Sequence, residues 1–177
     1  MMQILLTGGS ASGKSTYAEK IALNLPPPHY YIATMRKYDD ESLEKVKQHQ
    51  KMRAGKGFIT IEKETDLDEI ILPQKGTVLL ECLCNLTANE MFDHEGRISD
   101  VFDKILTSVE SLAAQSSAII IVTNDVGSDG GGYDQGTEEY IRTIGRLNSE
   151  LAQRSDYVFE LISGIALPLK GDLYGIA

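Results

Sequence analysis

Short apolar runs alternate with longer segments of mixed polarity along the whole chain. The apolar runs are rich in Ile, Leu, Val and Tyr, a composition typical of β-strands. They lie at Gln3–Thr7, Tyr30–Thr34, Phe58–Glu62, Thr77–Leu83, Ala118–Thr123, Tyr157–Ser163 and Ile165–Leu169. The longer segments have helical composition or spacing. They lie at Lys14–Leu25, Asp39–Ala54, Ser99–Gln115 and Tyr140–Arg154.

This order of strands and helices predicts the fold class. Strands that alternate with helices form βαβ crossovers, which produce a largely parallel sheet. The run Ala118–Thr123 lacks the polar alternation of a strand with one wet face, so we expect helices on both faces of the sheet. The chain has 177 residues, which suits one hydrophobic core. We therefore expect a single α/β domain over residues 1–177.

Composition and charge exclude several classes of protein. The formal net charge of −9 argues against broad nucleic-acid binding, which needs a basic face to displace counterions. No apolar run approaches the roughly 20 residues that span a bilayer, so no membrane span is expected. The first residues, MMQILLTGG, lack the cationic flank of a signal peptide, and we expect a cytoplasmic location. Cys82 and Cys84 are too few for a disulfide framework or a four-ligand zinc site, and we expect two small buried side chains on one side of a strand.

The strongest motif is a phosphate-binding loop. The sequence GGSASGKS matches G-x-x-x-x-G-K-[ST] in full, between a predicted strand and a predicted helix. Its residues are Gly8, Gly9, Ser10, Ala11, Ser12, Gly13, Lys14 and Ser15. The backbone N–H groups of such a loop surround phosphate oxygens, and the positive end of the helix adds to the attraction. We expect Lys14 to bind the β- and γ-phosphates of ATP or GTP, and the Ser15 hydroxyl to ligate Mg²⁺. The predicted fold is thus a single P-loop NTPase-like domain.

Two carboxylates are candidates for supporting the metal or activating a substrate hydroxyl. Glu81 and Asp125 follow two hydrophobic strands, and the carboxyl ends of parallel strands gather at the edge that carries the P-loop. Either residue suits the role, and the alternative for each is a solvated or capping carboxylate. The glycine-rich stretch Gly127–Gly136 is expected to be exposed, either as a substrate lid or as a plain surface loop.

A histidine lies on one stripe of the predicted helix Asp39–Ala54. Lys45, His49 and Arg53 are spaced four residues apart, so they share a face. A neutral imidazole can attack an α-phosphorus, and the flanking cations would stabilise the phosphates and disfavour the imidazolium. The alternative is a histidine on a solvated, charged helix. His29 and His94 lie among turn residues, and no role is expected for them.

Together these residues resemble the bifunctional adenosylcobinamide kinase and adenosylcobinamide-phosphate guanylyltransferase family. The resemblance covers nearly the whole chain. It is carried by ILLTGGSASGKSTYAE, YIAT, DDES-x-x-K-V-x-x-H-x-x-x-R, T-x-E at Thr60–Glu62, LLEC, VTNDVG, G-x-L-N-x-x-L-A and SGI. The chain differs from the family at Asp125, where glutamate is usual, and in the stretch SDGGGYDQGTEE, where a proline and an arginine are common.

The resemblance implies two reactions on one scaffold. One transfers a phosphoryl group from a nucleoside triphosphate to the hydroxyl of adenosylcobinamide, and the other transfers GMP from GTP to the resulting phosphate. It further implies that GMP passes through a covalent adduct on His49, and that the assembly is a homotrimer. Besides the P-loop, the guanine-nucleotide contacts it implies are Ala33, Thr34, Met35, Gln50, Lys51, Met52, Arg53, Glu62 and Glu81. The implied cofactors are GTP, ATP and Mg²⁺.

Two other functions are compatible with the P-loop. The first is a simpler small-molecule kinase in which His49 is inert and no guanylyl transfer takes place. The second is a regulatory module that binds GTP and switches a partner, although nothing in the chain beyond the loop resembles the switch elements of GTPases.

Overall fold

The computed structural model describes residues 1–36, 55–93, 95–127 and 130–172. The predicted helix Asp39–Ala54 therefore lies outside the described residues. The strands are β1 Met2–Thr7, β2 His29–Ala33, β3 Phe58–Glu62, β4 Thr77–Glu81, β5 Ala118–Val122, β6 Tyr157–Ile162 and β7 Ile165–Lys170. The helices are α1 Lys14–Asn24, α3 Leu83–Met91, α4 Phe102–Gln115 and α5 Gln135–Arg154, with a short 3₁₀ helix, η1, at Leu67–Glu69.

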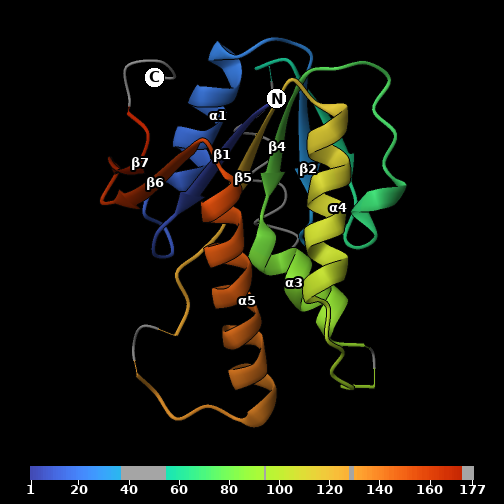
Figure 1. The fold of residues 1–177 in the computed structure, drawn as a ribbon, viewed down its shortest axis with the longest axis vertical. Coiled ribbons are helices and arrows are strands. Elements are labelled where there is room, and N and C mark those ends of the chain that lie inside the picture. Colours follow the sequence, from blue (N-terminus) through green and yellow to red (C-terminus); the bar gives the residue numbers. More distant parts are fainter. Residues whose placement is uncertain (37–54, 94, 128–129, 173–177) are drawn as a thin grey trace.

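The strands form one seven-stranded sheet in the order β3-β2-β4-β5-β1-β6-β7 (Figure 1). Neighbouring strands pair in parallel from β3 through β6, and β7 returns antiparallel along β6. The predicted mostly parallel sheet is confirmed. Strand β5 lies between β1, which leads into the P-loop, and β4, which ends at Glu81.

Helices cover both faces of the sheet, as the apolar strands predicted (Figure 1). On one face Ile4 and Leu6 of β1 pack with Ile21 of α1 in one hydrophobic cluster. On the other face the intervening Leu5 belongs to a second cluster, which includes side chains of α3, α4 and α5. Successive residues of β1 therefore serve different cores, as the pleat of a strand requires. No helix among the described residues is long and apolar enough to cross a lipid bilayer.

The structure corrects the predicted boundaries around β4. The strand ends at Glu81, two residues before the predicted end, and helix α3 follows directly. This helix escaped prediction because most of its residues are buried, which removes the polar face that marks an amphipathic helix. Cys82 and Cys84 are buried free thiols, as expected, but they lie at the start of α3 and not on a strand.

Helix α5 begins earlier than its sequence pattern predicts. Its first residue is Gln135, whereas the expected start is Tyr140. The side chain of Asp134 caps this end by accepting a hydrogen bond from the Thr137 N–H at 3.1 Å. The pKa of Asp134 is lowered, chiefly by its hydrogen bond with the Thr137 side chain. The glycine-rich stretch therefore ends in a capped helix and not in further loop.

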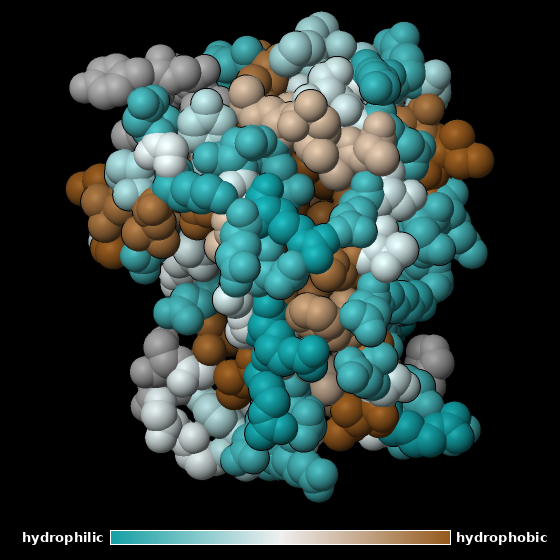
Figure 2. Space-filling model, in the orientation of Figure 1, coloured by the Kyte–Doolittle hydropathy of each residue, from teal (hydrophilic) through white to brown (hydrophobic). Residues whose placement is uncertain are grey.

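The β6–β7 end of the sheet is less well covered than the centre. Hydrophobic side chains gather on the surface there, at the left edge of Figure 2. The large aliphatic residues are Ile162, Ile165, Leu167 and Leu169, with 48, 65, 42 and 62% of their surface exposed. Pro168 lies on β7, the edge strand, and its lack of an N–H group hinders pairing with another strand.

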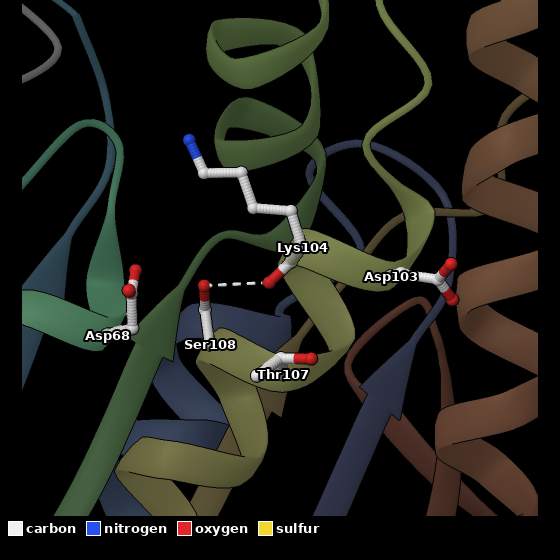
Figure 3. Close-up of a pocket in the computed structure, with 5 residues that line it drawn as sticks. All are labelled: Asp68, Asp103, Lys104, Thr107 and Ser108. Atoms are coloured by element: carbon white, nitrogen blue, oxygen red, sulfur yellow. Dashed lines mark hydrogen bonds between the residues drawn. The ribbon is translucent and has the colours of Figure 1, made fainter.

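A charged network ties η1, α3 and α4 together. The Lys104 ammonium of α4 donates to Asp66 and to Glu90, each at 2.6 Å, and the Glu90 carboxylate also accepts from the Asp66 N–H at 2.7 Å. In Figure 3 the Lys104 side chain extends away from Ser108, whose hydroxyl donates to the Lys104 carbonyl at 2.8 Å. The hydrogen bond that Lys104 donates lowers the pKa of Asp66, and the hydrogen bonds to Asp66 and Glu90 raise the pKa of Lys104 to about 12.

We expect Lys104→Met to lower the free energy of unfolding by about 1–3 kcal/mol, because the nearly buried Glu90 carboxylate loses a charged partner. Arg142→Met, at an exposed ion pair with Glu139, is the matched control and should cost less than about 1 kcal/mol. Urea titrations of the variants measure both values. Equal losses in the two variants would contradict the structural role of Lys104.

The Lys104 contribution should also depend on pH. The pKa of Asp66 is lower in the folded chain than its ordinary 3.8, so its stabilising effect is complete above that value. It is lost as the pH falls through the lowered folded pKa. The stability difference between the wild type and Lys104→Met should therefore shrink in acid, and urea titrations at a series of pH values below 4 measure this.

Candidate active site

The P-loop lies between β1 and α1, where the motif predicted it. Gly8 and Gly13 have φ angles of +138° and +98°, which favour glycine, and these two residues turn the chain from strand to helix. The Ser12 N–H donates to the Gly9 carbonyl at 3.3 Å within the loop. Helix α1 has no acidic residue in its first turn, so the positive end of its dipole is not offset there. The loop has the features of an anion-binding turn.

Lys14 is held inside this loop. Only 6% of its surface is exposed, and its ammonium donates to the carbonyls of Gly8 and Gly9 at 2.9 and 2.6 Å. A longer contact of 3.4 Å reaches the Ser12 hydroxyl. Burial lowers the pKa of Lys14, and the negative charge of Glu81 partly offsets this effect. The ammonium thus lies where a bound phosphate chain would replace the loop carbonyls as its acceptor.

The structure distinguishes the two candidate carboxylates. The Ser15 hydroxyl of α1 donates to Glu81 Oε1 at 2.5 Å, although β5 lies between β4, which ends at Glu81, and β1, which leads into the P-loop. Asp125 follows β5 and is exposed. Its backbone N–H donates to the Gly8 carbonyl at 3.3 Å, so its position near the P-loop is fixed through the main chain. Of the two, Glu81 is the carboxylate in contact with the P-loop serine.

The oxygen pair of Ser15 and Glu81 fits Mg²⁺. This ion prefers oxygen ligands, and in P-loop sites it takes most of them from phosphates and water. Within the described ranges, no three His, Cys, Asp or Glu side chains come together as a metal cluster. A metal here would therefore depend on Ser15, with Glu81 behind it, and on oxygens from the nucleotide and from water.

Further predicted nucleotide contacts line the same edge of the sheet. Ala33, Glu62 and Glu81 end three adjacent parallel strands, with Ala33 paired in register to each of the other two. Met35 follows on the chain and is half-buried. The sequence therefore identified residues that share one edge. Their contacts with a nucleotide stay predictions.

Thr34 is part of the frame of this edge. Its side chain is fully buried. Its hydroxyl accepts a hydrogen bond from the Cys82 N–H at 2.9 Å and lies 3.1 Å from the Glu81 carbonyl. These bonds attach the end of β2 to Glu81, the catalytic candidate, and to Cys82. The Thr34 N–H also donates to the Glu81 carbonyl at 3.1 Å, so both the hydroxyl and the backbone of Thr34 are engaged within the protein.

Two residues that the sequence did not single out support this frame. The Asn89 amide of α3 donates to the carbonyls of Thr34 and Glu64 at 2.7 and 3.0 Å. The Arg36 guanidinium donates to the Asn89 carbonyl at 3.1 Å and to the Glu64 carboxylate at 3.2 Å. Asn89 is nearly buried, and a buried amide needs hydrogen-bond partners, but its burial becomes evident only once α3 is recognised.

The VTN and G-x-L-N motifs meet in space. The Thr123 hydroxyl donates to the Asn148 side-chain oxygen at 2.7 Å, and the Asn148 amide donates to the Asn124 carbonyl at 3.2 Å. Helix α5 thereby holds the chain that leaves β5 beside the P-loop. Burial raises the pKa of the Cys82 thiol to about 12, which disfavours the thiolate at neutral pH.

The predicted nucleophile and its neighbours lie outside the described residues. These are Lys45, His49, Gln50, Lys51, Met52 and Arg53. His94 is also outside, whereas His29 begins β2 and its ring Nε2 lies 3.0 Å from the Leu25 carbonyl. His29 thus has a structural partner, which fits the absence of an expected catalytic role.

The fold and the site define an α/β P-loop nucleotide-binding protein. The sequence profile of the family described as cobinamide kinase / cobinamide phosphate guanyltransferase matches residues 4–169. The chain belongs to this family. It is accordingly a transferase of adenosylcobalamin biosynthesis, with cobinamide kinase and cobinamide phosphate guanylyltransferase as its two activities.

Relatives of known name support this assignment over almost the whole chain. The chain is 31% identical to the bifunctional adenosylcobalamin biosynthesis protein CobU of Escherichia coli (strain K12), covering 96% of this chain and 100% of the relative. It is 29% identical, with the same coverage, to CobU of Salmonella typhimurium. It is 27% identical to CobP of Pseudomonas aeruginosa, covering 97% of this chain and 99% of the relative.

A solved structure shows the shared fold at greater distance. A prototypical ATPase from the type III secretion system of pathogenic bacteria aligns with a TM-score of 0.52 and 11% sequence identity. The alignment covers 94% of this chain and 56% of that chain. At this identity the likeness concerns only the P-loop ATPase fold.

We expect Thr34→Val to destabilise the protein by about 1–3 kcal/mol, because the buried Cys82 N–H loses its acceptor. Thr34→Ser keeps the hydroxyl and is the matched control, with a smaller loss from the missing methyl group. Thermal and urea unfolding of the two variants measure the difference. Similar stability for Thr34→Val and wild type would show that the hydroxyl does not hold this edge.

Proposed function

We propose that the P-loop binds the triphosphate of GTP, and that group transfer takes place at the carboxyl edge of the sheet, where β4 ends at Glu81. The observation that carries this proposal is the 2.5 Å contact between the Ser15 hydroxyl and the Glu81 carboxylate. This contact joins the phosphate-binding motif to Glu81, an acidic residue that the family resemblance also implies as a nucleotide contact. The amides of Gly13, Lys14 and Ser15 at the start of α1 would receive the phosphate oxygens.

The Lys14 ammonium would donate to the β- and γ-phosphates in place of the Gly8 and Gly9 carbonyls. This would give the buried ammonium negatively charged partners, which form stronger hydrogen bonds. Bound Mg²⁺ would supply neutralisation of the charge that develops on the phosphate oxygens. Ser15 would hold the ion directly, and Glu81 would orient Ser15 or a water of the ion. These roles agree with the oxygen-only chemistry of the pair.

For guanylyl transfer we propose His49 as the nucleophile, on the family resemblance. A ring nitrogen forms a bond to the α-phosphorus of GTP, the bond to the bridging oxygen breaks, and pyrophosphate leaves with the electron pair. The imidazole then releases its proton to solvent. An oxygen of cobinamide phosphate next attacks the same phosphorus, and the P–N bond breaks while the imidazole takes a proton back from solvent. The GDP-linked corrinoid then leaves the regenerated histidine. Lys45 and Arg53 would stabilise the charge in these steps.

For the kinase activity, the hydroxyl of the cobinamide side chain attacks the γ-phosphorus of a nucleoside triphosphate, and the nucleoside diphosphate leaves. A carboxylate that accepts the hydroxyl proton completes the balance. Asp125 is exposed beside the P-loop and suits this role, while Glu81 is engaged with Ser15. The homotrimer implied by the resemblance and the cytoplasmic location also stay proposals, as does the choice of ATP or GTP as phosphoryl donor.

We expect Glu81→Gln to reduce guanylyl transfer about 10–100-fold, as is typical when the partner of a metal ligand loses its charge. The loss should be partly recovered by raising the Mg²⁺ concentration. Glu139→Gln, on the exposed face of α5, is the matched control and should leave the rate unchanged. If Asp125→Asn weakens the response to Mg²⁺ and Glu81→Gln does not, then the metal role belongs to Asp125.

GTP labelled at the α-phosphorus tests the histidine directly. We expect the wild type to retain label in an acid-labile, base-stable bond, because phosphoramidates hydrolyse in acid, and His49→Ala to retain none. His94→Ala is the matched control and should label normally. Labelling of His49→Ala to the wild-type level would refute the nucleophile. Phosphoryl transfer without any adduct would favour a kinase with an inert His49.

A further inference from the structure

The turn between β6 and β7 lies directly against the P-loop, although the two come from opposite ends of the chain. The Gly164 N–H donates to the Ser12 carbonyl at 2.9 Å. A Cβ atom placed on Gly13 would lie 3.3 Å from Gly164 Cα, and one on Gly8 would lie 2.4 Å from the Leu161 carbonyl oxygen. One side of the loop is therefore in main-chain contact with β6 and the turn.

The turn itself has a defined shape. Ser163 and Gly164 link two antiparallel strands as a two-residue connection, with φ angles of +51° and +82°. Positive φ at both positions matches the type I′ turn, which fits the twist of a β-hairpin. Such a turn directs its groups reproducibly, so the Gly164 N–H is presented to the loop from a rigid hairpin.

The hydrogen bond constrains an amide of the phosphate cradle. The Ser12–Gly13 peptide bond is trans, as it is not among the cis bonds of the described chain. In a trans peptide the carbonyl and the N–H point in opposite directions. Because the Ser12 carbonyl points to Gly164, the Gly13 N–H points away from the hairpin. Gly13 directly precedes α1, where the N–H groups that receive phosphate begin.

We propose that Gly164 is a positioning residue for triphosphate binding, which acts through the Ser12 carbonyl and sets the direction of the Gly13 N–H. The inference rests on the proposed nucleotide site and adds to it a contact from the far end of the chain. It also accounts for the glycine at position 8, because any side chain there would collide with β6. The hairpin thus lines one side of the P-loop, and its position fixes the direction of the Gly13 N–H before the nucleotide binds.

Two replacements separate the N–H from the shape of the turn. Glycolic acid in place of Gly164, introduced by ligating a synthetic C-terminal segment, replaces the N–H by an ester oxygen and keeps the positive φ that proline would forbid. Gly164→Asn keeps the donor, tolerates positive φ and has open space for its Cβ. Affinities for Mg²⁺–GTP and for GMP are measured by calorimetry. Only GTP carries the β- and γ-phosphates, so a cradle defect should weaken GTP binding alone. We expect the ester at position 164 to weaken GTP binding about tenfold, the effect of one lost buried hydrogen bond, with GMP binding unchanged.

Gly164→Asn should bind GTP within about twofold of wild type, because it keeps the donor. The proposal is overturned if the ester variant binds GTP as the wild type does, if it loses GTP and GMP affinity equally, or if Gly164→Asn is as defective as the ester variant. A wild type that fails to bind GTP would instead refute the proposed function. If the ester variant does not fold, amide exchange in the wild type decides: GTP should slow exchange at Gly164, and unchanged exchange would refute the positioning role.

Discussion

The hydrogen bond between Ser15 and Glu81 is the contact on which the arrangement of the site depends. It crosses β5 and joins the end of β4 to the first turn of α1, so phosphate-binding and acidic groups meet over one edge of the sheet. A carboxylate in this position is favourable because the positive end of α1 and the buried Lys14 ammonium lie beside it. The same proximity partly restores the pKa that burial lowers in Lys14.

The rest of the structure holds the two members of this pair in place from opposite sides. Thr34, itself held by Asn89, fixes the end of β4 through the Cys82 N–H. The β6–β7 turn fixes the P-loop through the Ser12 carbonyl. Main-chain groups provide most of these supports, so the site depends on strand register more than on exposed side chains. A phosphate site made in this way is ordered before its ligand binds, which reduces the entropy cost of binding.

Local patterns were enough to predict the P-loop, the parallel sheet and two carboxylates at its carboxyl edge, and the family resemblance implied the other residues there. They left the choice between Glu81 and Asp125 open, because the sequence does not reveal that β5 lies between β1 and β4. Helix α3 was missed since it is short and buried on nearly all sides. The contact of Gly164 with Ser12 joins distant segments through the main chain, and no residue type signals it. The position of His49 relative to the P-loop stays a prediction from resemblance.

The most direct test of the central claim is a crystal structure of the protein with Mg²⁺ and a GTP analogue that resists hydrolysis. The account predicts β-phosphate oxygens on the amides of Gly13–Ser15, with the Lys14 ammonium moved from the Gly8 and Gly9 carbonyls to the phosphates. Mg²⁺ should lie on the Ser15 hydroxyl with Glu81 directly behind it. A triphosphate bound away from this loop, or a metal held by Asp125 with Glu81 uninvolved, would contradict the account.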